Sequence, residues 1–292
     1  MTSPASVASL PATASGKTSR DENFPVASSL IAARHRRPIM AFYRFARAAD
    51  DIADHETLDP ASKYALLDVM EATLLGRSDA HADALPLRLA LAERGMPPRH
   101  PLDLLVAFRA DVAKNRYRDW QELIGYCRHS AMPVGRFVLD VHGESTQAWP
   151  ASDALCAALQ VINHVQDCGK DFRGLGRVYL PQEALEAAGA KIADIGAAQA
   201  SPQLRQCLRQ MAVRTGALLD ESAGFSRQIR DFRLALEVTV IQRLAVTLNG
   251  LLLRRDPLSQ PVHLRKPRAA LVAMLGLCDG LAGRLRWRAP SP

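Results

Sequence analysis

The sequence has few of the features that mark sheet-rich, disulfide-bonded or dinucleotide-binding proteins. Only 5% of its 292 residues are aromatic, and an abundance of alanine and leucine favours helices over strands. The five cysteines are scattered and form no CxxC pair, which is typical of reduced thiols in a cytosolic protein. The pair Gly174 and Gly176 follows no predicted strand, so it is not a dinucleotide-binding fingerprint. The eight histidines form no HExxH motif.

Long apolar runs are also scarce. We expect no membrane-spanning segment, which would need about 18 apolar residues, and no secretory signal in the first 20 residues. The net charge is +7, with 37 basic and 30 acidic residues, which fits an anionic ligand, a membrane surface or nucleic acid. The basic residues are spread along the chain rather than gathered in one stripe, which argues against nucleic acid. Together, the scattered cysteines and the lack of a predicted signal or membrane span lead us to expect a cytoplasmic protein.

Helical periodicity covers most of the chain, and no period-2 strand series or internal repeat interrupts it. Residues 1–20 are rich in Ser, Ala, Thr and Pro and are predicted to be disordered. Residues 21–288 are predicted to form a single all-α domain. Helical patterns outside the acidic motifs occupy residues 60–76, 83–94, 101–117, 120–131, 202–227, 231–255 and 267–286.

Three local signals refine these helix boundaries. A short helix is expected from Phe24 to Arg34, and Arg36-Arg37-Pro38 should reset the chain before the long helix that ends at Asp54. Asp119 is a suitable N-cap for the helix that begins with Trp120. Pro133 should kink that helix or start a new one.

The most informative stretch is Phe42 to Asp54, FYRFARAADDIAD. Asp50 and Asp54 are four residues apart, so they share one helix face about 6 Å apart, where like charges repel. The spacing recurs at Asp167 and Asp171 in LQVINHVQDCGKD, and each pair closes a mostly apolar helix. An exposed acidic turn could explain one such pair. Two matching pairs indicate a shared cation.

Magnesium suits such a site, because Mg²⁺ binds a few carboxylates and keeps its other positions for water and substrate phosphate. Arg44 and Arg47 lie just before Asp50. They could pair with nearby carboxylates, or they could donate to a diphosphate. Arg177, the last residue of a loop predicted from Arg173 to Arg177, is open to both interpretations.

Three segments resemble signatures of the squalene/phytoene synthase family: FYRFARAADDIAD, YCRHSAMPVG and LQVINHVQDCGKDFRGLGRVYLP. The resemblance runs from about Phe24 to Pro181 and implies an all-α isoprenoid synthase bundle with a central cavity. It implies that four aspartates act in catalysis and bind Mg²⁺ that bridges to diphosphate, namely Asp50, Asp54, Asp167 and Asp171. It also places a set of residues around the substrate: Tyr43, Arg47, Gln160, Asn163, Arg177 and Tyr179.

Departures from the family pattern point to one of its branches. Residues 22–26, which include Phe24, replace a His-Ser-x-Ser-Phe-like segment, Gln166 replaces a frequent Arg, and Arg128 replaces a Tyr. Phe24 and Arg128 are accordingly expected among the substrate-binding residues. These features resemble the hydroxysqualene-forming branch of bacterial hopanoid pathways. That branch receives presqualene diphosphate from a sister presqualene diphosphate synthase.

Two alternative functions remain open on these residues. One is a prenyltransferase that joins two prenyl diphosphates head to head, since the departures leave the first condensation step undecided. The other is a non-catalytic assembly protein with the same fold. Loss of the aspartates would mark that class, and all four are present.

The C-terminal stretch Leu281 to Arg288, LAGRLRWR, alternates apolar and basic residues. Such a segment could bind peripherally to an anionic membrane surface, which would suit a C30 lipid substrate. An ordinary solvated terminal helix explains the pattern equally well.

Overall fold

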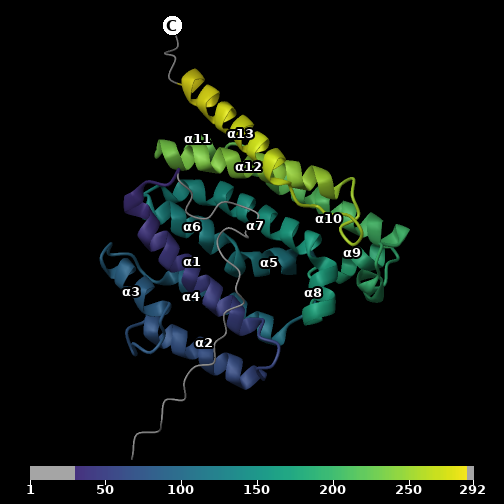
Figure 1. The fold of residues 1–292 in the computed structure, drawn as a ribbon, viewed down its shortest axis with the longest axis horizontal. Coiled ribbons are helices and arrows are strands. Elements are labelled where there is room, and N and C mark those ends of the chain that lie inside the picture. The colour runs from purple at the N-terminus through teal and green to yellow at the C-terminus, as the bar shows by residue number, and fades with distance from the viewer. Residues whose placement is uncertain (1–29, 288–292) are drawn as a thin grey trace, which may run out of the picture.

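The computed structural model describes residues 30–287, with side chains to residue 283 (Figure 1). Within this range there is no strand, only an isolated parallel bridge between Arg116 and Val178. The all-α prediction is therefore confirmed. Phe24, the predicted disordered segment 1–20 and Arg288 lie outside the described residues. The α-helices are α1 (Ala33–Ala53), α2 (Pro60–Leu74), α3 (Ala84–Ala92), α4 (Arg99–Ala113), α5 (Trp120–Ser130), α6 (Met132–Val141), α7 (Trp149–Gln166), α8 (Cys168–Leu175), α9 (Gln182–Ala187), α10 (Pro202–Glu221), α11 (Phe225–Gln228), α12 (Phe232–Leu252) and α13 (Lys266–Trp287); two short 3₁₀ turns are η1 (Thr146–Ala148) and η2 (Ile192–Gly196).

Side-chain caps fix where several helices begin. The Asp119 carboxylate accepts a hydrogen bond from the Glu122 amide at 2.8 Å, as the sequence predicted for the start of α5. Ser201 caps α10 in the same way, and Pro202 occupies the first helical position, where the missing N–H has no cost. α5 ends at Ser130, and α6 starts again at Met132 with Pro133 in its first turn. The expected restart at Pro133 is confirmed.

The predicted reset at Arg36-Arg37-Pro38 is wrong, because α1 runs without interruption from Ala33 to Ala53 and contains Pro38. A proline inside a helix leaves the carbonyl four residues earlier without its usual donor. That carbonyl belongs to Arg34, and the Arg94 guanidinium donates a hydrogen bond to it. A second hydrogen bond from Arg94, at 3.2 Å, reaches the Val141 carbonyl at the end of α6. A residue distant in sequence thus replaces the lost bond, which local pattern could not reveal.

The helices pack in layers around α7 (Figure 1). α6 and α7 pack against each other, α10 and α12 cover one side of α7, and α13 lies on α12. On the other side, α1 packs on α3 and α4, and α2 contacts α1, α3 and α4. Apolar residues fill two main cores, one centred on α7, α10 and α12 and the other on α1 to α4. α1 and α7 therefore lie inside the fold, with the acidic pairs near their C-terminal ends.

α12 differs from the expectation that no segment is apolar enough to span a membrane. Its 21 residues meet that criterion by length and composition, and 61% of its most apolar window is buried within the protein. Its buried residues include Leu234, Leu244 and Leu248, and the helix packs on α7, α10 and α13. This is the pattern of a helix in a protein core, where apolar residues face other helices.

The second acidic pair does not sit on one continuous helix. α7 ends at Gln166, Asp167 lies between the helices, and Asp171 lies in the first turn of α8. The stretch from Arg173, expected to be a loop, is helical to Leu175. It ends at Gly176, whose φ of 64° is the left-handed conformation that glycine adopts at helix ends. The Asp171 amide still donates to the Asp167 carbonyl at 2.9 Å, which keeps the one-turn relation of the pair.

The role of Arg94 can be tested through Pro38. We expect Arg94→Ala to lower the free energy of unfolding by about 0.5–1.5 kcal/mol, the usual contribution of a hydrogen bond. In a Pro38→Ala background, which restores an N–H to the helix, the same substitution should cost less. Chemical denaturation of the four proteins measures the difference. Arg37→Ala, which removes only an exposed ion pair with Glu93, is the control. Equal costs of Arg94→Ala in both backgrounds would contradict this account.

Candidate active site

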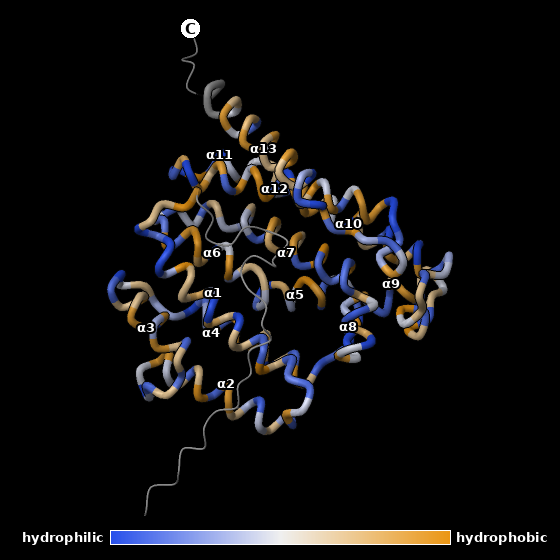
Figure 2. The backbone as a smooth tube through the Cα atoms, in the orientation of Figure 1, coloured by the Kyte–Doolittle hydropathy of each residue, from blue (hydrophilic) through white to orange (hydrophobic). Residues whose placement is uncertain are grey.

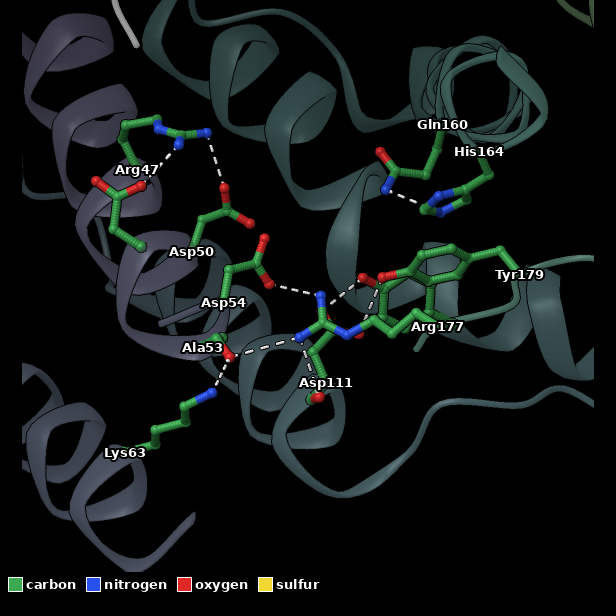
Figure 3. A network of polar contacts seen from close by, with 12 residues as sticks. Arg47, Asp50, Ala53, Asp54, Lys63, Asp111, Gln160, His164, Arg177 and Tyr179 are labelled. Atoms are coloured by element: carbon green, nitrogen blue, oxygen red, sulfur yellow. Dashed lines mark hydrogen bonds and ion pairs between the residues drawn. The ribbon is translucent and has the colours of Figure 1, made fainter. Parts of the chain in front are cut away.

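The first acidic pair lies at the C-terminal end of α1. Asp50 is in the last turn, and Asp54 is the C-cap residue, whose amide donates to the Asp50 carbonyl at 2.9 Å. Arg47 donates one hydrogen bond to Asp50 Oδ2 and another to Asp51 Oδ1, each at 2.7 Å (Figure 3). Arg47 thus holds the side chain of Asp50 by one oxygen.

Arg177 joins this helix end to the rest of the bundle. It is 8% exposed, and its guanidinium donates to Asp54 Oδ1 at 2.5 Å and to the Asp111 carbonyl at 3.1 Å. Lys63 donates to the Ala53 carbonyl at 2.8 Å. Two cations therefore meet the C-terminal end of α1, where the helix dipole and its last carbonyls favour positive charge (Figure 3).

The pKa values show that the carboxylates form one crowded group. Burial, and then the neighbouring Asp54, raise the pKa of Asp50 to about 7, against the opposing effect of Arg47. Burial, and then Asp167, raise the pKa of Asp171 to about 7. The charge of Asp54 also raises the pKa of Asp171. The two acidic pairs are therefore linked electrostatically through Asp54 and Asp171.

Asp111 on α4 is a buried carboxylate that no sequence pattern indicated. Burial raises its pKa to about 6, although Arg177 and a hydrogen bond from Tyr126 lower it. Tyr126 Oη donates to Asp111 Oδ2 at 2.7 Å, and Tyr179 Oη lies 3.4 Å from Asp111 Oδ1. Asp111 therefore connects Arg177 to the tyrosines behind it.

An aromatic wall stands next to Arg177. The His164 and Tyr179 rings stack with centroids 3.5 Å apart, and Tyr117 stacks on Tyr179 at 5.5 Å. Gln160 Nε2 lies 3.1 Å from His164 Nε2 (Figure 3). Burial, and then the charge of Arg177, lower the pKa of His164 to about 3. His164 is therefore neutral at physiological pH, and the wall adds polarity without positive charge.

Two hollows adjoin this group. A cleft of about 540 Å³ opens beside Asp54, and its lining carries four cationic side chains: Lys63, Lys114, Arg173 and Arg177. An apolar cavity of about 300 Å³ lies between α1, α6, α7 and α12. α1 lines it with Phe42, Tyr43 and Ala46, while α7 contributes Leu155 and Leu159.

The structure gathers most of the predicted residues and leaves two outside. Arg47, Arg177, Tyr179 and Gln160 join the network, Tyr43 lines the apolar cavity, and Asn163 lies one turn before Asp167.

Arg128 is exposed on α5 and makes no hydrogen bond or ion pair with the described residues, while Phe24 falls outside them. Gln166 is buried, and its amide donates to the Val262 carbonyl at 2.6 Å. The residues missed by sequence reasoning are Lys63, Asp111, Tyr126 and His164.

The donor set fits a hard divalent cation. Asp50, Asp54, Asp167 and Asp171 supply carboxylate oxygens, which are the ligands that Mg²⁺ prefers. Burial is the main cause of the raised pKa values of Asp50 and Asp171, and the neighbouring Asp54 and Asp167 add to it. A bound cation would favour the ionised form of these carboxyl groups. His, Cys and Met ligands, which would favour softer metals, are absent from this set of four.

Comparison with known proteins gives the same family by three routes. The sequence profile of squalene/phytoene synthases matches residues 17–268. The chain is 61% identical to a hydroxysqualene synthase of Rhodopseudomonas palustris over 90% of this chain and 89% of that protein. It is 50% identical to one from Zymomonas mobilis over 93% and 91%. A squalene synthase structure from Alicyclobacillus acidocaldarius superposes with a TM-score of 0.65 at 29% identity, covering 91% of this chain and 89% of that one.

The charge crowding predicts how stability responds to pH and Mg²⁺. The pKa of Asp50 is higher in the fold than its ordinary value of 3.8, so its ionised form opposes folding above about pH 7 and this cost fades as the pH falls. We expect metal-free Asp50→Asn to melt at a higher temperature than the parent protein at pH 8.5, with a smaller gap at pH 5.5. Mg²⁺ at pH 8.5 should raise the melting temperature of the parent more than that of the variant.

Differential scanning fluorimetry with and without a chelator measures these shifts. The control is Asp68→Asn, the same chemical change at a carboxylate whose side chain is 68% exposed. An equal Mg²⁺ response in parent and Asp50→Asn would show that Asp50 does not hold the cation.

Proposed function

This chain belongs to the squalene/phytoene synthase family, and on that premise we propose that it converts presqualene diphosphate and water into hydroxysqualene and diphosphate. The observation that carries the proposal is that α1 and α7 both line the apolar cavity and both lead to an acidic pair at their C-terminal ends. Ala46, Asp50 and Asp54 follow each other at intervals of four on α1 and its end. Leu155, Leu159, Asn163 and Asp167 do the same on α7 and its end. A prenyl chain in the cavity would therefore place its diphosphate among the carboxylates and arginines.

The substrate diphosphate would be held at the polar end. Bound Mg²⁺, which Asp50, Asp54, Asp167 and Asp171 would hold, supplies positive charge to the departing diphosphate oxygens. Arg47 and Arg177 lie within the same network and can donate forked hydrogen bonds to those oxygens. Lys63, Lys114 and Arg173 line the adjoining cleft and extend the positive surface. Fixed donors of this kind stabilise a leaving anion most strongly in a site that excludes water.

The apolar cavity would govern the fate of the carbon skeleton once the diphosphate departs. The C–O bond breaks, its electron pair leaves with the diphosphate, and a cyclopropylcarbinyl cation remains. Phe42, Leu155 and Ile241 are among the side chains that would surround the rearranging cation and keep bulk water away. One admitted water would then form the new C–O bond and lose a proton. The relatives named hydroxysqualene synthase, at 50% to 61% identity, support this outcome.

The main alternative is head-to-head condensation of two prenyl diphosphates. Relatives named phytoene synthase, such as that of Mycobacterium tuberculosis with 33% identity over 58% of this chain, keep it open. Incubation with farnesyl diphosphate alone separates the two, because only a condensing enzyme consumes it. A non-catalytic assembly protein would consume neither substrate. The presence of all four aspartates, with Arg47 bonded to Asp50 and Arg177 to Asp54, favours an enzyme over an assembly protein.

Loss of one carboxylate should abolish most of the activity. We expect Asp50→Asn and Asp167→Asn to reduce turnover of presqualene diphosphate by about 100-fold or more, the effect of losing one electrostatic stabiliser at other active sites. Circular dichroism should show unchanged helix content. The assay is release of diphosphate and product analysis at saturating Mg²⁺, with the exposed Asp220→Asn on α10 as the control. Near-normal turnover of either active-site variant would refute the assigned role.

We also propose that α13 makes peripheral contact with an anionic membrane. Its exposed apolar residues are Leu271, Met274, Leu275 and Leu281, of which the first three have the i, i+3, i+4 spacing of one helix face. Three exposed cations lie at its start: Arg265, Lys266 and Arg268. α13 projects beyond the bundle (Figure 1), and apolar residues recur along it (Figure 2). An apolar stripe next to basic residues suits the headgroup boundary. The stripe begins ten residues before the predicted segment Leu281 to Arg288, so most of it was not anticipated.

Vesicle sedimentation tests this contact. Binding to anionic vesicles should fall with rising salt and in Leu271→Glu/Leu275→Glu, while neutral vesicles should bind weakly. Val213→Glu, at an apolar position on α10 that is 63% exposed, is the matched control. Removal of residues 281–292 separates the tail from the stripe. Undiminished binding of Leu271→Glu/Leu275→Glu would exclude α13 as the contact surface.

A further inference from the structure

A buried carboxylate lies on the wall of the apolar cavity, away from the four aspartates. Glu237 on α12 is 2% exposed. Among the described residues that line the cavity, it is the only one with a charged side chain. Its neighbours along the lining are apolar, including Leu234, Val238 and Ile241. A buried carboxylate needs hydrogen bonds or charges to stabilise it, and the position of Glu237 brings an ionisable group to a mostly apolar lining.

A hydroxyl group lines the same cavity from α7. Ser152 is fully buried, and its Oγ makes no hydrogen bond with a nitrogen or oxygen of the described residues. Cys156 lies beside it, and a thiol is a weak partner. Serines in helices usually satisfy their hydroxyl by bonding to the carbonyl four residues earlier. Ser152 does not, which leaves its hydroxyl available on the cavity side.

Gly135 on α6 provides the space in which this hydroxyl sits. A Cβ at position 135 would lie 2.4 Å from Ser152 Oγ and 2.6 Å from Cys156 Sγ. No side chain larger than hydrogen fits there unless both groups move. The close approach of α6 to α7 therefore keeps Ser152 Oγ in place, and Gly135 itself lines the cavity.

These features are those of a water site inside an otherwise apolar cavity. A buried water needs two to four polar partners and a space of at least one water volume. Glu237 and Ser152 offer acceptors and a donor from two helices, α12 and α7, that pack together. The cavity of about 300 Å³ has room for water next to an apolar ligand group. Apart from Tyr43 and Cys156, the remaining lining is apolar.

We propose that Glu237 and Ser152 hold the water that captures the carbocation, an assignment that rests on the proposed function. The water oxygen forms the new C–O bond with its own electron pair while one of its O–H bonds breaks. The released proton moves to the Glu237 carboxylate, and from there to solvent or to the released diphosphate. Ser152 orients the water, and Glu237 acts as the base. Without this water, the cation loses a proton from carbon instead and gives C30 hydrocarbons.

The experiment compares products from presqualene diphosphate in the intact protein and in Glu237→Gln, Ser152→Ala and Gly135→Ala. Loss of a positioned base costs about 10²–10⁴-fold. We therefore expect Glu237→Gln to lower hydroxysqualene formation by about 100-fold or more, while diphosphate release falls by less than about tenfold. The hydrocarbon share should rise correspondingly. Ser152→Ala and Gly135→Ala should shift the product ratio in the same direction, and water labelled with ¹⁸O should report the remaining capture.

Glu144→Gln is the matched control. Glu144 is also a buried carboxylate, which accepts hydrogen bonds from the Arg230 and Asp231 amides, but it does not line the cavity. The product ratio of Glu144→Gln should equal that of the parent protein. If the parent makes hydroxysqualene and both Glu237→Gln and Ser152→Ala keep its product ratio, the water site is refuted and the proposed function stands. A parent protein that does not consume presqualene diphosphate overturns both.

Discussion

The crowding of partly buried carboxylates is the constraint around which the site is arranged. Burial, and then the charge of Asp54, raise the pKa of Asp50, and burial, and then Asp167, raise that of Asp171, to which Asp54 also contributes. Arg177 offsets part of this charge from an almost fully buried position. Its guanidinium reaches α1 through Asp54 and α4 through the Asp111 carbonyl. The same side chain therefore balances charge and fixes the distance between two helices.

That arrangement depends on how the chain returns to the site after α8. Gly176 turns the backbone at the end of α8, and the Val178 amide then donates to the Asn115 carbonyl at 3.0 Å. This short connection carries Arg177 and Tyr179 on either side of Val178, so both side chains reach the Asp111 region. The hydroxyls of Tyr126 and Tyr179 then satisfy the buried Asp111 carboxylate. The polar contacts are thus continuous from Asp54 to the aromatic wall.

The sequence predicted the parts of the site that depend on local spacing. The two acidic pairs are visible because a helix places residues i and i+4 on one face. The cap at Asp119 and the helix restart at Pro133 also follow local rules. Asp111 and His164 gave no such signal, because their roles come from partners 68 and 15 residues away in the chain. Pro38 misled for the same reason, since Arg94 replaces its missing bond from a distant part of the chain. Arg128, placed at the substrate by resemblance, is turned to solvent.

In the proposed reaction, the polar end and the apolar cavity have separate physical tasks. Ionisation of a prenyl diphosphate requires charge complementarity at the leaving group, which four aspartates, a bound cation and nearby arginines can supply to many prenyl chains. The fate of the resulting cation depends on which groups touch it, and these lie on α1, α6, α7 and α12. A change in the cavity lining can therefore redirect the product without weakening ionisation. Differences in reaction outcome among proteins with this fold should accordingly reside in positions such as Gly135, Ser152 and Glu237, whose significance appears only when the helices are packed together.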